Sequence, residues 1–304
     1  MVNKLGLGAL VTFLVPWYVF NSPSEEQTRP KQYALPNEIA VVETTLPYET
    51  GEREFIVDDS AKGMSRIETK LEKVVKTEDI DFSKDFEIKT DRYHFSKGED
   101  MWVSRQIGKV LSLPAKLLFW DWDAGLGQDA ERTRASLAML ENNPDIKDIT
   151  LRINHNRALY DMTRMFWDDK LTERNNILAR ILLGIPASLG SELFMEFGRG
   201  DYYNPFTRTA VGYSNIESIT AHELGHNKDF SRFTSDWEYS LANIIPGVQL
   251  YKEAVASKRA KGEILDKRDD WQFYRYLIPA FATYVLATFN GLAAWKKIIK
   301  RKRK

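Results

Sequence analysis

The sequence predicts an α+β fold, in a chain of 304 residues that is long enough for one sizeable domain with appendages. Residues 148–154 alternate between apolar and polar side chains, which is typical of a β-strand. Residues 128–142 place apolar side chains at helical spacing, and Asn143-Pro144 then predicts the end of that helix. A second helix signal begins near Asn215. This order predicts helices beside a small mixed sheet.

The N-terminal third divides into an apolar run and a polar arm. The run that follows Lys4 resembles a signal h-region or an uncleaved signal anchor, which we expect over residues 1–20. Residues 21–100 mix both charges and contain few apolar side chains, so they predict a charged linker or loosely folded arm. The apolar density then rises, and we expect the folded domain over residues 101–270.

An apolar segment lies at the start of this domain, from Val110 to Trp120, with Pro114 and Lys116 interrupting it. It is too short to span a bilayer. Two interpretations stay open: the segment lines the core, or it touches a membrane surface.

The C-terminal end combines an apolar stretch with a basic tail. Residues 276–295 contain no charged side chain, and about 20 such residues span a bilayer core as a helix. Aromatic residues at both ends of the stretch fit a transmembrane helix, and seven positive charges follow in residues 296–304. With Lys4 and the tail inside, the domain between them lies on the non-cytoplasmic side of the membrane. A buried amphipathic helix is the alternative.

Composition narrows the possible partners. The 43 positive and 43 negative side chains balance, so the chain without its seven-charge tail carries 0 − 7 = −7. An acidic body argues against nucleic-acid binding by the domain. The chain has no cysteine, which excludes disulfides and thiolate ligands.

The sequence motif that indicates metal binding and catalysis is His222-Glu223-Leu224-Gly225-His226. On a helix, positions i and i+4 share a face, so both imidazoles can reach one metal ion. Glu223 lies beside that face, where it can take a proton from a water molecule at the metal. Ser214-Asn215-Ile216-Glu217 reads as a capping box, which predicts a helix start near Asn215 and puts the motif in its second and third turns.

A catalytic zinc ion takes three protein ligands and keeps one position for water. The residue six positions after His226 is Arg232, which cannot bind a cation, so a third ligand at that place is excluded. Glu253 is the candidate, in a segment of helical composition over residues 250–260. Its alanine neighbours would let that helix approach the motif helix, and a buried carboxylate there needs a partner or a cation.

Three other acidic residues, Asp229, Asp236 and Glu238, compete for roles at this site. Asp236 remains an alternative third ligand, although Ser235-Asp236-Trp237-Glu238 also reads as a helix start. Asp229, three residues after His226, is better placed to orient a ligand than to be one.

The runs 219–226 and 253–260 together resemble the membrane-associated gluzincins of the HtpX and CAAX-prenyl-protease type, over roughly residues 200–262. That resemblance implies a zincin-like fold, a Zn²⁺ cofactor and Glu223 as general base. The zinc ligands that it implies are His222, His226 and Glu253. Ser257 stands where the family has an aspartate, so the resemblance implies that Ser257 supports the ligands.

The strand over residues 148–154 is expected to border the cleft and to hold an extended substrate by backbone pairing. Asn154 and His155 follow it and are candidate substrate-binding residues, with His155 also a candidate oxyanion contact. A polar strand end without a functional role is the alternative.

These observations predict a membrane-anchored zinc metalloendopeptidase that acts on a peptide or protein substrate and binds no nucleic acid. The alternative is a catalytically inactive, membrane-tethered zinc-binding or scaffold protein with a protease-derived fold. A third hypothesis takes the basic tail as the functional part, a tether to anionic lipid or nucleic acid. The cleavage specificity and the oligomeric state are left open.

Overall fold

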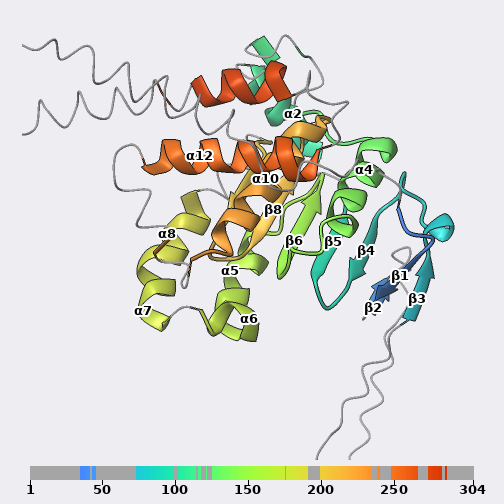
Figure 1. Cartoon of the computed structure of the whole chain (residues 1–304), viewed down its shortest axis with the longest axis horizontal. Coiled ribbons are helices and arrows are strands. Elements are labelled where there is room, and N and C mark those ends of the chain that lie inside the picture. The colour runs from blue at the N-terminus through green and yellow to red at the C-terminus, as the bar shows by residue number, and fades with distance from the viewer. Residues whose placement is uncertain are drawn as a thin grey trace, which may run out of the picture.

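A computed structural model describes residues 35–41, 43–45, 73–98, 102–113, 116–117, 121, 125–174, 176–190, 199–233, 238–239, 248–265, 273–282 and 285. Within these residues the protein has a mixed α+β fold (Figure 1). The strands are β1 (Glu38–Val41), β2 (Glu43–Thr45), β3 (Lys73–Lys76), β4 (Phe86–Lys89), β5 (Tyr93–Lys97), β6 (Ile149–Ile153), β7 (Tyr202–Asn204) and β8 (Thr209–Gly212). The longer helices are α2 (Trp102–Leu111), α4 (Ala130–Glu141), α5 (Ala158–Trp167), α10 (Glu217–Phe230) and α12 (Val248–Arg259). Shorter helical segments are η1 (Thr77–Asp79), α6 (Asp169–Thr172), α7 (Ile177–Ala179), η2 (Arg180–Gly184), α8 (Ile185–Ser188), η4 (Ala260–Ile264) and η6 (Phe273–Leu277).

Six of the described strands form one mixed sheet in the order β2-β4-β5-β6-β8-β7. The pairs β5–β6 and β6–β8 are parallel, whereas the other pairs of this sheet are antiparallel. Strands β1 and β3 pair separately. The α+β class and the small mixed sheet therefore agree with the prediction from sequence.

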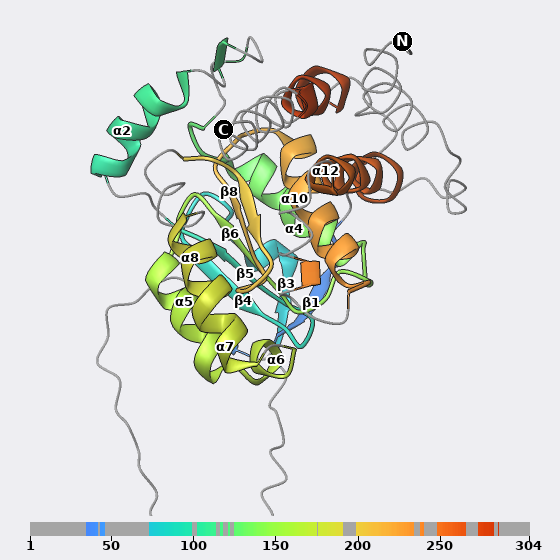
Figure 2. The ribbon, with the colours of Figure 1, turned by 90° about the vertical axis from the view of Figure 1, so that its left-hand side faces the viewer.

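Helices cover both faces of the sheet, as Figure 2 shows. On one face, apolar side chains of β6 join the main core together with those of α4 and α10. On the other face lie α5 and the short helices that follow it. The strand predicted over residues 148–154 is β6, and every one of its side chains is buried.

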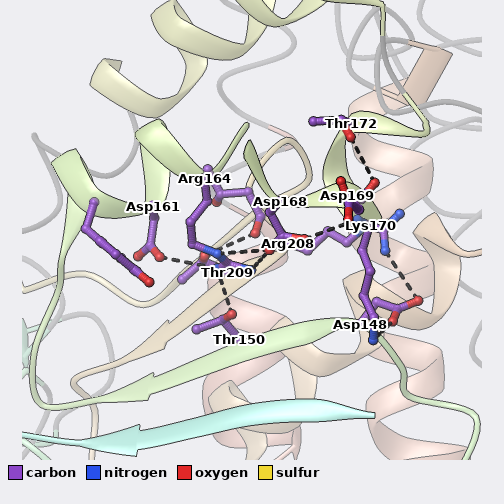
Figure 3. Close-up of polar contacts among 12 residues, drawn as sticks. Asp148, Thr150, Asp161, Arg164, Asp168, Asp169, Lys170, Thr172, Arg208 and Thr209 are labelled. Atoms are coloured by element: carbon purple, nitrogen blue, oxygen red, sulfur yellow. Dashed lines mark hydrogen bonds and ion pairs between the residues drawn. The ribbon is translucent and has the colours of Figure 1, made fainter. Parts of the chain in front are cut away.

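The polar side chains of β6 are buried because α5 supplies partners for them. Arg152 is fully buried and forms an ion pair with Asp161, with Nη2 and Oδ1 2.6 Å apart. Arg164 donates to the hydroxyl of Thr150 over 2.8 Å and pairs with Asp168 at 2.9 Å (Figure 3). A buried charge requires such a partner, so this network ties α5 to the sheet.

The polar arm expected over residues 21–100 differs from the structure. Strands β4 and β5 belong to the main sheet, and the side chains of Ile88 and Phe95 are fully buried. Their apolar residues alternate with charged ones, so the composition of the stretch concealed a two-residue period.

Among the described residues, no helix is both long and apolar enough to cross a membrane. The expected anchor at residues 1–20 and the basic tail at 296–304 lie outside the described residues. Of the apolar stretch 276–295, residues 276–282 and 285 are described, and helical structure continues from η6 through residue 282.

Candidate metal centre

The motif helix α10 follows β8 and begins at Glu217 rather than at Asn215. The expected capping box does not form, because tertiary partners take its side chains. The hydroxyl of Ser214 donates to Asp201, and Glu217 forms an ion pair with Arg132. Ile216 precedes the helix without a side-chain cap. The motif still occupies the second and third turns.

Helix α12 crosses close to α10 at Gly225. A Cβ atom at this position would collide with the backbone carbonyl of Ala256. The absence of side-chain bulk on both helices therefore permits the approach, as the alanines around Glu253 predict. This contact brings Glu253 of α12 opposite the motif histidines.

Three potential ligand atoms converge between the two helices. The Nε2 atom of His222 lies 3.1 Å from Oε2 of Glu253 and 3.1 Å from Nε2 of His226. The Nε2 atom of His226 lies 3.4 Å from the same carboxylate oxygen. Tetrahedral zinc with bonds of about 2.05 Å would separate its ligand atoms by about 3.3 Å. The donor set and its spacing therefore fit a tetrahedrally coordinated metal ion.

The other ring nitrogen of each histidine has its own hydroxyl partner. Nδ1 of His222 lies 3.0 Å from Oγ of Ser257, and Nδ1 of His226 lies 3.2 Å from the hydroxyl oxygen of Tyr239. In metal sites such contacts fix the ring orientation and the tautomer. Here they leave Nε2 of each ring pointing to the common centre.

Two tyrosines of the site were missed by the sequence reasoning. Besides the contact of Tyr239 with His226, the ring of Tyr203 from β7 stacks on the same imidazole, at 6.3 Å between centroids and 7° between planes. Tyr203 also accepts a hydrogen bond from Asn227 over 3.3 Å. Neither tyrosine stands at a motif spacing from the histidines, so only the fold reveals them.

The two glutamates of the site titrate in opposite directions. Burial raises the pKa of Glu223 to about 8, and the nearby carboxylates of Glu253 and Asp201 add to this shift against the influence of His222. Burial also acts to raise the pKa of Glu253, but the charge of His226 and hydrogen bonds from both histidines outweigh it. The pKa of Glu253 therefore lies well below its usual range.

Asp229 is buried near the site but makes no described hydrogen bond to either imidazole. Burial raises the pKa of Asp229, and the charge of His226 opposes this shift through space. The orienting role expected for Asp229 therefore falls to the hydroxyls of Ser257 and Tyr239. The competing ligand Asp236 lies outside the described residues.

Asn154 and His155 have local structural partners. The side chain of Asn154 accepts from the backbone N–H of Gln128 over 2.5 Å and donates to its carbonyl over 2.8 Å. Nε2 of His155 lies 2.9 Å from Oγ of Ser96. Neither residue belongs to the described metal-ligand group, and their substrate contacts stay a prediction.

Strand β6 cannot hold a substrate in the way that the sequence suggested. It pairs with β5 on one side and with β8 on the other, so its backbone groups are already used. Strand β7 ends the described sheet on the side of α10, which it contacts.

Comparison with known proteins finds no match to a family model, to a curated protein or to a solved structure. The resemblance to gluzincins thus rests on the motif residues and on their geometry.

Proposed function

We propose that this protein is a membrane-anchored zinc metalloendopeptidase with a zincin-like fold. The observation that carries the proposal is the convergence of His222, His226 and Glu253 on one point between α10 and α12. Each imidazole keeps one nitrogen for that point and uses the other for a hydroxyl partner. Two histidines and one carboxylate leave one position of a tetrahedral ion open, as hydrolysis requires.

A zinc ion held by these residues would lower the pKa of a coordinated water from about 15.7 to about 7 and polarise a substrate carbonyl. Glu223 follows the first ligand in sequence. The charge of a bound cation beside it would counter its raised pKa, so that its carboxylate would be ionised and would accept the proton of the attacking water. It then delivers that proton to the amine that leaves when the peptide bond breaks. Ser257 and Tyr239 hold the ligand imidazoles in orientation during both transfers.

Tyr203 of β7 stacks on His226 and so connects this strand with the proposed ligands.

The proposal is tested with the purified full chain, by measuring bound zinc and the hydrolysis of casein. We expect one zinc ion per chain and hydrolysis that a chelator abolishes. Glu223→Gln should retain the zinc and lose the activity, because glutamine cannot accept the proton. Glu253→Ala should lose both.

The result also separates the proposed enzyme from its main alternative. Zinc binding without any hydrolysis by the unaltered chain would favour the inactive zinc-binding or scaffold protein. Hydrolysis that survives Glu223→Gln would show that the assigned general base is wrong.

A further inference from the structure

Four large apolar side chains are exposed at the end of α2 and just after it. Their exposed fractions are 70% for Val110, 52% for Leu111, 44% for Leu113 and 59% for Leu117. We call these four residues the α2 apolar face. A contiguous group of this kind on a protein surface marks a contact with a partner or a membrane.

The same segment is fixed on the body of the protein by its other side. Gly108 is buried, and a Cβ atom there would collide with the side chain of Arg199. Ser112 is buried too, against Gly125. Gly108 and Ser112 therefore face the body of the protein. The α2 apolar face is directed away from that body in a fixed orientation.

The charge of the segment suits an anionic surface. Between Met101 and Trp120 the sequence has three basic residues and no acidic one. Lys109 is exposed beside the apolar face, whereas Lys116 is buried. An apolar face with basic neighbours is the composition of helices that lie in the interface of a membrane with anionic lipids.

The position of the α2 apolar face in the molecule also agrees with contact to a membrane. The hydroxyl of Tyr276, the first residue of the charge-free stretch, donates to the carboxylate of Asp121. Arg275 lies 3.9 Å from the same carboxylate. α2 and η6 lie at the same end of the molecule in both views, the upper end of Figures 1 and 2. The charge-free stretch, whose first residues Tyr276 and Leu277 are buried in the protein, thus starts beside the segment that carries the exposed apolar side chains.

We propose that the α2 apolar face inserts into the interfacial layer of an anionic phospholipid bilayer. The face and the C-terminal apolar stretch would then hold the domain to the membrane at two points, which limits how far it can tilt. The inference deepens the proposed membrane attachment and does not depend on the metal centre. Its failure would therefore leave the proposed hydrolysis untouched.

The test uses the full chain, whose lack of cysteine makes single-site labelling unambiguous. Nitroxide labels are attached to V110C, L113C and L117C and, as a matched control, to L182C. Leu182 is 67% exposed and lies between α7 and α8, at the opposite end of the molecule from α2 in Figures 1 and 2. Each protein is reconstituted into vesicles of phosphatidylcholine and phosphatidylglycerol in equal amounts.

The readout is the collision rate of the label with oxygen, which concentrates in lipid, relative to a water-soluble nickel chelate. We expect a ratio several-fold higher at the three α2 positions than at position 182. A ratio equal to that of the control would place the face in water and overturn the proposal. Low collision rates with both reagents would mean that protein covers the face, from this chain or a second copy, and would also overturn it.

Vesicles of phosphatidylcholine alone test whether anionic headgroups contribute to the insertion of the α2 apolar face. We expect a lower ratio at the same three positions, because Lys109 then meets no anionic headgroup. An unchanged ratio would show that the α2 apolar face inserts without a need for anionic headgroups, and would contradict that element of the proposal.

Discussion

Each motif imidazole is oriented by one neutral hydroxyl. His222 is held from α12 by Ser257, and His226 is held by Tyr239. The gluzincin pattern has an aspartate where this chain has Ser257, and a charged partner raises the basicity of a ligand more than a hydroxyl does. At the scale of single residues we therefore predict a metal site whose ligands are well oriented. Its affinity for the metal should be lower than it would be with an aspartate at position 257.

We expect Ser257→Ala to lower the zinc affinity about 10- to 100-fold, the usual effect of losing an outer partner of a ligand. The measurement is competition with a chelating dye. Ser257→Asp is the matched variant and should bind zinc more tightly than the alanine variant does. Equal affinities of the unaltered chain and the alanine variant would contradict an orienting role.

His155 makes the stability of the fold depend on pH. Burial lowers the pKa of His155 from its ordinary value of 6.5 to about 3, and the charges of Arg152 and Arg157 add to the shift. Between these two pH values the unfolded chain binds more protons at His155 than the folded protein does. The contribution to stability is therefore complete above pH 6.5 and is lost as the pH falls towards 3.

The expected result is that His155→Gln loses less unfolding free energy than the unaltered chain when the pH falls from about 7.5 to about 5. Glutamine can still bond to Ser96 but does not titrate. Urea unfolding at both pH values measures the difference. Identical losses in the two proteins would show that His155 is not responsible.

At the scale of elements, the local pattern predicted secondary structure more reliably than it predicted contacts. Residues 128–142 and 148–154 do form α4 and β6, because an amphipathic period depends on neighbouring residues alone. The capping box before α10 does not form, because Ser214 and Glu217 bond to Asp201 and Arg132 instead. The interior place of β6 depends on strands that are distant in sequence.

The contact between α10 and α12 yields a prediction for Gly225. We expect Gly225→Ala to destabilise the fold by about 1–3 kcal/mol, the usual cost of overpacking, because the added methyl group meets the backbone of Ala256. The helices must separate to accommodate it, so zinc affinity should fall as well.

Gly190→Ala is the control for this change, since no atom lies within 4 Å of the added Cβ there. Unfolding free energies and zinc contents of both variants are compared with those of the unaltered chain. Equal behaviour of the two variants would mean that the helices tolerate the methyl group.

At the scale of the whole molecule, the candidate centre joins two layers of the fold. His222 and His226 come from the helix that covers the sheet, whereas Glu253 comes from the helix outside it. A ligand that binds only the folded state stabilises it by mass action. We therefore expect zinc to raise the unfolding temperature of the entire domain, and not only to serve catalysis.

Chelation should lower the unfolding temperature of the full chain, and added zinc should restore it. At a free zinc concentration of 100 times Kd the expected stabilisation is about 2.7 kcal/mol. Glu253→Ala should unfold at a temperature that neither chelator nor zinc changes. Thermal unfolding followed by circular dichroism gives the comparison, and an unaltered chain insensitive to chelation would count against a resident metal.

The sequence by itself determined which metal-ligating and proton-accepting side chains are present, and it determined the local secondary structure of the chain. Two histidines four apart with a glutamate between them, and a later glutamate among alanines, were enough to nominate the ligand atoms that the fold brings together. These features are local, since helical periodicity decides which side chains share a face.

Only the tertiary structure decided what surrounds those atoms. The hydroxyl of Tyr239 and the stacked ring of Tyr203 come from segments whose sequence holds no sign of the site. The same is true of strands β4 and β5, which emerge from a charged stretch to complete the sheet. Contacts between distant segments arise from packing of the whole chain, which no local period encodes.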